Sequence, residues 1–142
     1  MALPTKLLLE IVTPDRVLVT EQVDELQVPG AEGYFGVLPG HAPLLASLHV
    51  GELWYRKGQE KHYLAIAFGF VEVLPDKVTV LARIAEREQD IDVIKQEADR
   101  RAAEGELQSA VTAEDAERAR IAMLTAMVKL RAAERVRMKR GI

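Results

Sequence analysis

The chain has 142 residues, of which 49% are hydrophobic and 29% are charged. This length suits one compact domain with an appendage and is too short for two full hydrophobic cores. The absence of cysteine excludes disulfides, thiolate metal sites and cysteine nucleophiles. No apolar stretch approaches the roughly 20 residues needed to cross a bilayer, and the first residues match neither a signal peptide nor a transit peptide. We therefore expect a soluble, intracellular protein without direct membrane insertion.

Residues 1–88 have the pattern of a β-rich body. Apolar and polar residues alternate in short runs, all aromatic side chains lie between Tyr34 and Phe70, and turn signals recur about every ten residues. The clearest hairpin turns are residues 57–60 and the Pro75-Asp76 pair. Because no helical period intrudes, we predict an antiparallel β-sandwich, or flattened barrel, over this region.

Residues 89–142 are rich in Ala, Glu, Arg and Gln and predict an antiparallel hairpin of two helices. Asp90 or Asp92 fits the N-cap of the first helix, and Gly105 fits the stop at its C-terminal end. We expect this helix to pack through a narrow apolar stripe formed by Ile94, Ala98 and Ala102.

The second helix is predicted to begin at Thr112, which fits an N-cap, and to continue without interruption to about Arg140. Short alanines on both helices allow the two to approach closely. Because the apolar stripe of the first helix is thin, we expect the hairpin to be marginally stable and able to open.

The C-terminal end of the chain is strongly basic. Residues 117–142 carry eight basic and two acidic side chains, and six of the basic ones crowd together: Lys129, Arg131, Arg135, Arg137, Lys139 and Arg140. Three roles are open: a solvated helix end that complements the helix dipole, a surface that docks on an acidic protein, or a nucleic-acid contact. The last is disfavoured, because no aromatic residue lies among the basic ones to stack on a base. Since like charges repel, we predict that the folded hairpin gains little from this cluster.

The segment VPGAEGYFGVLPGHAPLL, from Val28 to Leu45, is a tightly turned loop between strands. It lacks the glycine spacing of a phosphate-binding loop. His41 is the obvious candidate for catalysis, but no recognisable nucleophile stands near it, and a hydrogen bond that holds the turn explains it better. His41, His49 and His62 lack the spacing of metal ligands. The sequence therefore predicts neither a catalytic site nor a metal site.

This loop also carries a resemblance to a known family. The residues VPGxEGxxGxLPGHAPL, from Val28 to Leu44, resemble the signature of the ε subunit of bacterial F-type ATP synthase. The resemblance continues through residues 68–73 and 78–82, the acidic joint at residues 90–92 and the Ala-rich hairpin. It covers essentially the whole chain.

The resemblance implies a non-catalytic rotor subunit at the cytoplasmic face of the bacterial inner membrane. In this family the β-sandwich binds the γ subunit and rests on the polar loops of the c-ring, so Glu32, Tyr34 and His41 are expected to face those partners. The hairpin either folds against the sandwich or extends along γ toward the catalytic α and β subunits and blocks ATP hydrolysis. The basic cluster is then the inhibitory surface.

Some members of this family bind ATP through the motif Ile/Leu-Asp-x-x-Arg-Ala at the start of the first helix. Ile91 and Asp92 agree with the motif, whereas Lys95 replaces the arginine and Gln96 the alanine. Lysine keeps the positive charge but loses the planar fork that holds phosphate bidentately. We therefore expect no resident cofactor and, at most, weak regulatory binding of ATP by Ile91, Asp92 and Lys95.

Two other classes of function stay open. One is a stand-alone β-sandwich adaptor with a helical interaction tail. The other is a small nucleic-acid-binding protein that uses the basic helix, and its affinity would fall steeply with salt. The resemblance, in contrast, implies no nucleic-acid partner. Capture of γ separates the rotor subunit from both alternatives.

Overall fold

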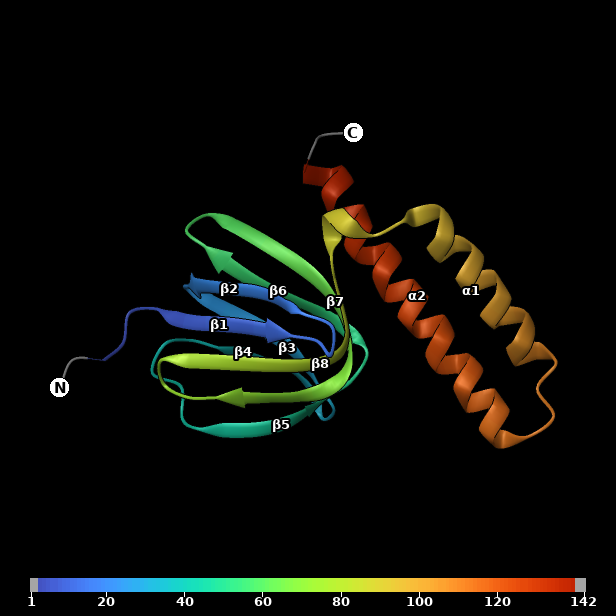
Figure 1. Ribbon diagram of the computed structural model, residues 1–142, viewed down its shortest axis with the longest axis horizontal. Coiled ribbons are helices and arrows are strands. Elements are labelled where there is room, and N and C mark those ends of the chain that lie inside the picture. The colour runs from blue at the N-terminus through green and yellow to red at the C-terminus, as the bar shows by residue number, and fades with distance from the viewer. Residues whose placement is uncertain (1–2, 140–142) are drawn as a thin grey trace.

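The computed structural model describes residues 3–139, without the side chains of Arg137 and Lys139. A β-sandwich lies beside a helical hairpin, and the last strand leads into the hairpin through a short 3-10 turn (Figure 1). The elements are β1 (Leu7–Val12), β2 (Val17–Val23), β3 (Glu25–Gly30), β4 (Gly33–Val37), β5 (Leu44–Leu48), β6 (Gly51–Lys57), β7 (Glu60–Val73), β8 (Lys77–Arg87), η1 (Glu88–Asp90), α1 (Val93–Gln108) and α2 (Ala113–Lys139). The predicted fold class is confirmed.

The strands form one hydrogen-bonded path in the order β2-β1-β8-β7-β5-β3-β4, and β6 pairs with β3 and β7. Both predicted hairpins are present, with Lys57 opposite Glu60 and Val73 opposite Val78. One pair departs from the predicted antiparallel pattern, because β1 and β8 run parallel. Turn signals report only neighbouring strands, so this long-range pairing has no local signature in the sequence.

A bend in β7 joins the two layers of the sandwich. Residues 60–66 of β7 pair with β6, whereas residues 69–73 pair with β5. At the bend, Phe68 and Gly69 have positive φ angles of 61° and 128°. A Cβ atom on Gly69 would lie 1.9 Å from the carbonyl oxygen of Leu81, so only glycine fits here. One strand therefore serves both layers.

The main hydrophobic core lies wholly inside the sandwich. Alternate side chains of the strands point inward, as expected for sheets with one solvated face. The largest fully buried side chains are Leu7, Leu9, Ile11, Leu26, Leu53, Leu64, Ile66, Val23, Val28, Val37, Val71 and Val73. None of the buried members of this core follows Ala82, so the described part of the hairpin contributes nothing to it.

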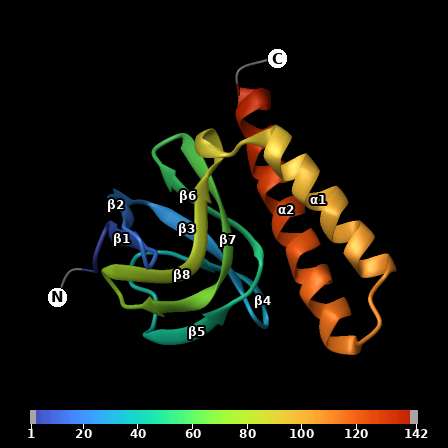
Figure 2. The same cartoon turned by 45° about the vertical axis from the view of Figure 1, so that its right-hand side comes forward.

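The hairpin lies along one side of the sandwich, with α2 against β7 and β6 (Figures 1 and 2).

Both predicted N-caps are confirmed. The amide of Lys95 donates to Asp92 Oδ1 at 3.1 Å, and that of Asp115 donates to Thr112 Oγ1 at 3.0 Å. Within residues 3–139, neither helix contains a stretch both long and apolar enough to span a membrane.

Two predictions about α1 are wrong. Gly105 does not end the helix, which continues to Gln108 with the Ser109 amide bonded to the Gly105 carbonyl. A glycine inside a helix costs only about 1 kcal/mol, and the added turn half-buries Leu107. The predicted stripe is also on the wrong side, because Ile94 is 84% exposed and Ala98 and Ala102 are exposed with it.

The helices instead meet through their smallest side chains. Ala103 of α1 and Ala119 and Ala126 of α2 are almost fully buried, and Gln96 is buried on the same side of α1. Small residues let two helices approach closely, so the packing face follows the alanines rather than the bulkiest hydrophobic residues.

Candidate functional site

The contact between α2 and the sandwich has a small apolar centre. Ala132 and Ala133 of α2 are buried against Ala65 of β7 and Ile91 of the joint, with Val128 partly buried beside them. Each buried methyl or methylene group contributes about 0.8 kcal/mol. Three alanines and one isoleucine therefore hold the hairpin only weakly, and the surrounding polar contacts have a large share in its position.

Lys129 forms the first of these polar contacts. Its Nζ donates a hydrogen bond to Glu86 Oε1 of β8 at 2.8 Å, and the residue is only 9% exposed. Charged residues are rarely buried without a partner. Lys129 thus connects α2 to the sandwich in the docked hairpin.

Arg135 forms the second contact, one turn and a half further along α2. Its Nε lies 3.4 Å from Glu52 Oε2 of β6, and its guanidinium lies over the ring of Tyr63 with 4.8 Å to the ring centre. The Glu52 side chain is only 9% exposed, and its Oε1 has no hydrogen-bond partner among the described residues. A carboxylate is therefore buried beneath the hairpin.

These two pairs correct one prediction about the basic cluster. The folded hairpin does gain from the charge, because Lys129 and Arg135 each face a carboxylate of the sandwich. The prediction considered only the repulsion between like charges along α2, whereas the sandwich supplies carboxylates that attract two of them. Arg131 is exposed. The side chains of Arg137 and Lys139, and all of Arg140, lie outside the described residues.

The three residues proposed for ATP all have structural partners. Ile91 is buried against Ala132 and Ala133, and Asp92 caps α1. The Nζ of Lys95 donates to Asp99 Oδ2 at 3.0 Å, and this hydrogen bond raises the pKa of the exposed Lys95 ammonium. The Lys95 ammonium has further N–H donors, but the Asp99 carboxylate beside it neutralises its charge and repels a phosphate.

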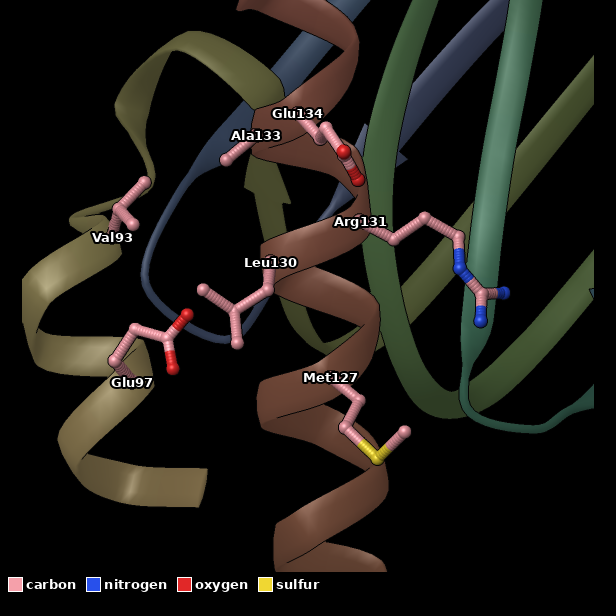
Figure 3. Close-up of a pocket in the computed structure, with 7 residues that line it drawn as sticks. All are labelled: Val93, Glu97, Met127, Leu130, Arg131, Ala133 and Glu134. Carbon is pink, nitrogen blue, oxygen red and sulfur yellow. The ribbon is translucent and has the colours of Figure 1, made fainter. Parts of the chain in front are cut away.

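A groove of about 370 Å³ runs between the two helices (Figure 3). Leu130 points from α2 toward α1, whereas Arg131 turns away toward the strands. The carboxylates of Glu97 and Glu134 lie on its lining, together with Val93, Met127 and Ala133. Glu97 pairs with Arg100, with Nη2 3.3 Å from Oε2, and the guanidinium of Arg131 points away, so the groove is poorly suited to a phosphate.

The prediction of a single loop from Val28 to Leu45 is wrong, because this segment contains β4, so Tyr34 lies on a strand and Glu32 and His41 lie on the turns at its two ends. Glu32 is in the turn between β3 and β4, and the hydroxyl of Tyr34 accepts a hydrogen bond from the Glu52 amide at 3.0 Å. His41 follows the opposite end of β4, where Gly40 bonds to Pro75 beside the β7–β8 turn. His41 Nδ1 lies 2.6 Å from the Ala42 carbonyl oxygen, so the predicted turn hydrogen bond is present. Within residues 3–139, no cluster of three metal-ligating side chains occurs.

Sequence reasoning missed Glu52, Glu86 and Tyr63. Strand alternation places Glu52 on the outer face of β6, between the buried Gly51 and Leu53, where an acidic side chain is ordinarily solvated. Nothing in the local sequence indicates that α2 covers that face. The only available signal was the presence of opposite charges on β6, β8 and α2.

Comparisons with known proteins identify the family to which this fold is similar. Residues 6–88 match the family described as ATP synthase, Delta/Epsilon chain, beta-sandwich domain. The chain is 47% identical over 130 residues to the ATP synthase epsilon chain of Syntrophobacter fumaroxidans, covering 92% of this chain and 97% of that protein. It is 51% identical over 100 residues to that of Koribacter versatilis, covering 70% of each.

Solved structures agree with the sequence matches. A chain in the cryo-EM structure of the Euglena gracilis mitochondrial ATP synthase, described as OSCP/F1/c-ring in rotational state 1, superposes with a TM-score of 0.80 at 26% identity. The match covers 94% of this chain and 84% of that one. A chain of the Tetrahymena thermophila mitochondrial enzyme, at 17% identity and a TM-score of 0.64, shows the shared fold alone. The chain therefore belongs to the family of ATP synthase epsilon chains.

Proposed function

We propose that this chain is a non-catalytic central-stalk subunit of a proton-translocating F-type ATP synthase, and that its hairpin inhibits ATP hydrolysis when it leaves the sandwich. The subunit would lie peripherally at the cytoplasmic face of the bacterial inner membrane. The sandwich would couple rotation to the c-ring, and the hairpin would regulate the enzyme.

The separation of the two hydrophobic clusters carries this proposal. The main core is complete within the sandwich, and the hairpin contacts it through a second cluster of Ala65, Ile91, Ala132 and Ala133. Detaching the hairpin exposes only a few methyl groups and leaves the sandwich core closed. A folded body with a weakly held helical arm is the arrangement that a two-state regulator needs.

An exposed apolar patch on the sandwich suits the γ subunit. Phe70 of β7 lies directly opposite Leu81 of β8, and both side chains are more than half exposed. They line a surface groove of about 510 Å³ that also includes Val12, Leu48 and Phe68. Contiguous exposed apolar surface in a folded domain indicates a protein contact. We assign the γ subunit to it, the c-ring polar loops to the surface around Glu32, Tyr34 and His41, and the α and β subunits to the basic end of α2.

Removal of residues 129–142 from the assembled complex tests this function. The truncated α2 would lack all six basic residues, from Lys129 to Arg140, so it could not engage acidic surfaces of the catalytic head. We expect ATP hydrolysis to rise while association with γ stays nearly intact. Hydrolysis that is unchanged across a range of ionic strength would show that the end of α2 does not inhibit.

ATP enters the proposal only as a weak ligand of the hairpin. The Asp99 carboxylate beside Lys95 repels a phosphate, and Asp92 already accepts the cap hydrogen bond. Lys95→Arg would supply the bidentate fork and is expected to tighten ATP binding in a calorimetric titration. An exposed control on the same helix, Arg101→Lys, should leave the affinity unchanged. Equal affinity in the wild type and in the Lys95→Arg variant would remove Lys95 from the site.

A further inference from the structure

Glu52 is an unusual residue for its position in the fold. It lies on the outer face of β6, yet its side chain is nine-tenths buried because α2 covers it. Its backbone amide is satisfied by the Tyr34 hydroxyl, and its Oε2 faces Arg135. Its Oε1 is buried without a hydrogen bond from any described residue. The carboxylate therefore depends on Arg135 for compensation.

The two partners differ in their access to water. The Arg135 side chain is 42% exposed and lies over the Tyr63 ring. Its Nε is buried without a hydrogen bond to a described residue, but the rest of the guanidinium keeps favourable surroundings without Glu52. Glu52 has no such alternative while the hairpin is docked. A buried charge that loses its partner is strongly destabilising, whereas removing both charges is often nearly neutral. When α2 lifts away, however, Glu52 regains water.

We propose that Glu52 and Arg135 are positioning residues that set how often the hairpin leaves the sandwich. The buried carboxylate stabilises the docked hairpin only when Arg135 covers it, and opposes docking when it does not. Any contact that draws Arg135 onto another acidic surface would leave Glu52 unpaired and so release α2. The effect of hairpin release on ATP hydrolysis rests on the proposed function. The docking equilibrium does not, because it can be measured in the isolated chain.

The natural absence of cysteine allows a direct measurement of this equilibrium in the full chain. Ala65 is 3% exposed beneath α2, so an Ala65→Cys thiol reacts with a small reagent only when the hairpin lifts. Ala82 is equally buried, but in the main core, and Ala82→Cys reports opening of the sandwich instead. The labelling rate of each thiol is compared among variants that share the same reporter cysteine.

Arg135→Met should speed labelling at residue 65 by at least about tenfold, because it leaves the buried Glu52 carboxylate without a partner. Arg135→Lys, which keeps the charge, should stay close to the wild-type rate. Arg120→Met is the matched control, since Arg120 lies on the same helix, is exposed, and pairs with Glu117 of α2 itself and not with the sandwich. Its rate should change by less than about twofold. Labelling at residue 82 should be unaffected throughout.

The most decisive observation is whether Glu52→Gln raises or lowers the labelling rate at residue 65. Glu52→Gln alone should raise the rate at residue 65 only slightly, by about threefold or less. Added to Arg135→Met, the same Glu52→Gln change should slow labelling, because no charge is left unpaired. Equal rates for Arg135→Met and Arg120→Met, or a Glu52→Gln change that speeds labelling in both backgrounds, would overturn the proposal.

Hydrolysis by the assembled complex separates this proposal from the proposed function. If labelling follows the expected pattern but Glu52→Lys, which repels Arg135 and keeps all six basic residues, leaves hydrolysis unchanged, the pair still controls docking and the inhibitory role of the hairpin is wrong. If labelling fails to follow the pattern while removal of residues 129–142 raises hydrolysis, the inhibitory role stands and the Glu52–Arg135 pair does not control docking.

Discussion

The two ion pairs between α2 and the sandwich differ in how far their carboxylates are exposed to water. Lys129 and Arg135 both face carboxylates of the sandwich, but Glu86 is about one-third exposed whereas Glu52 is almost fully buried. Loss of Lys129 returns Glu86 to water at little cost, because partly solvated ion pairs contribute about 1 kcal/mol or less. Loss of Arg135 has no such relief while the hairpin is docked.

Asp24 provides a prediction about acid stability. The Lys6 ammonium donates a hydrogen bond to its carboxylate, and the Gly58 amide donates another at 2.7 Å, so the pKa of Asp24 lies below its usual value of 3.8. A carboxylate with a lowered folded-state pKa stabilises the protein above its unfolded-state pKa. That contribution is lost as the pH falls through the folded-state pKa.

Asp24→Asn should therefore lower the melting temperature at about pH 6, and the difference from the wild type should shrink below about pH 4. Asp15→Asn, at an exposed position in the β1–β2 turn, is the control and should change little at either pH. A wild-type advantage over Asp24→Asn that persists at about pH 2 would contradict the assignment.

Among the elements, both hairpin turns that border β7 were predicted, but not that residues 60–73 form one bent strand that serves both layers. The alternation on either side of the bend is visible in the sequence. The bend depends on the Leu81 carbonyl, twelve positions away in the chain, which forbids a side chain at Gly69. The packing face of α1 also depends on residues far away in the sequence. This face is set by the alanines of α2 and not by the apolar stripe of α1 itself.

Substitution at Gly69 tests the role of the bend. Gly69→Ala should destabilise the sandwich by at least about 3 kcal/mol, because a positive φ and a clash with backbone act together. Gly58 is the matched control, as it also has a positive φ but no atom within 4 Å of the added Cβ. Gly58→Ala should cost roughly 1–2 kcal/mol. Equal losses in urea denaturation would show that the bend is not sterically constrained.

For the whole molecule, the division into sandwich and hairpin was visible in composition, because aromatic residues and most glycines end at residue 70 and the helical tail follows. The loop motif also identified the family, which the comparisons confirm. The contact between the two parts was not predictable. It depends on side chains more than forty positions apart, such as Glu86 and Lys129, and on which face of the sheet α2 covers.

The completeness of the sandwich core predicts that residues 1–88 fold and bind γ without the hairpin. All buried members of the main core lie within this range, and so does the Phe70–Leu81 patch. Leu81→Glu in this fragment should abolish γ binding without unfolding it, because residue 81 is more than half exposed. Gln59→Glu, at an exposed position in the β6–β7 turn and outside this groove, serves as the control for added negative charge. A folded fragment that fails to capture γ would refute this division of labour.

The most direct test of the central claim is the rate of ATP hydrolysis by complexes that differ only in this subunit. Removal of residues 129–142 eliminates the proposed inhibitory end, whereas Glu52→Lys places a like charge opposite Arg135 and frees the hairpin with all six basic residues in place. If docking opposes inhibition, the two changes act in opposite directions. Hydrolysis should be fastest with the deletion, intermediate with the wild type and slowest with Glu52→Lys. A rate with Glu52→Lys that equals or exceeds the wild-type rate, despite a measured increase in hairpin release, would contradict the claim.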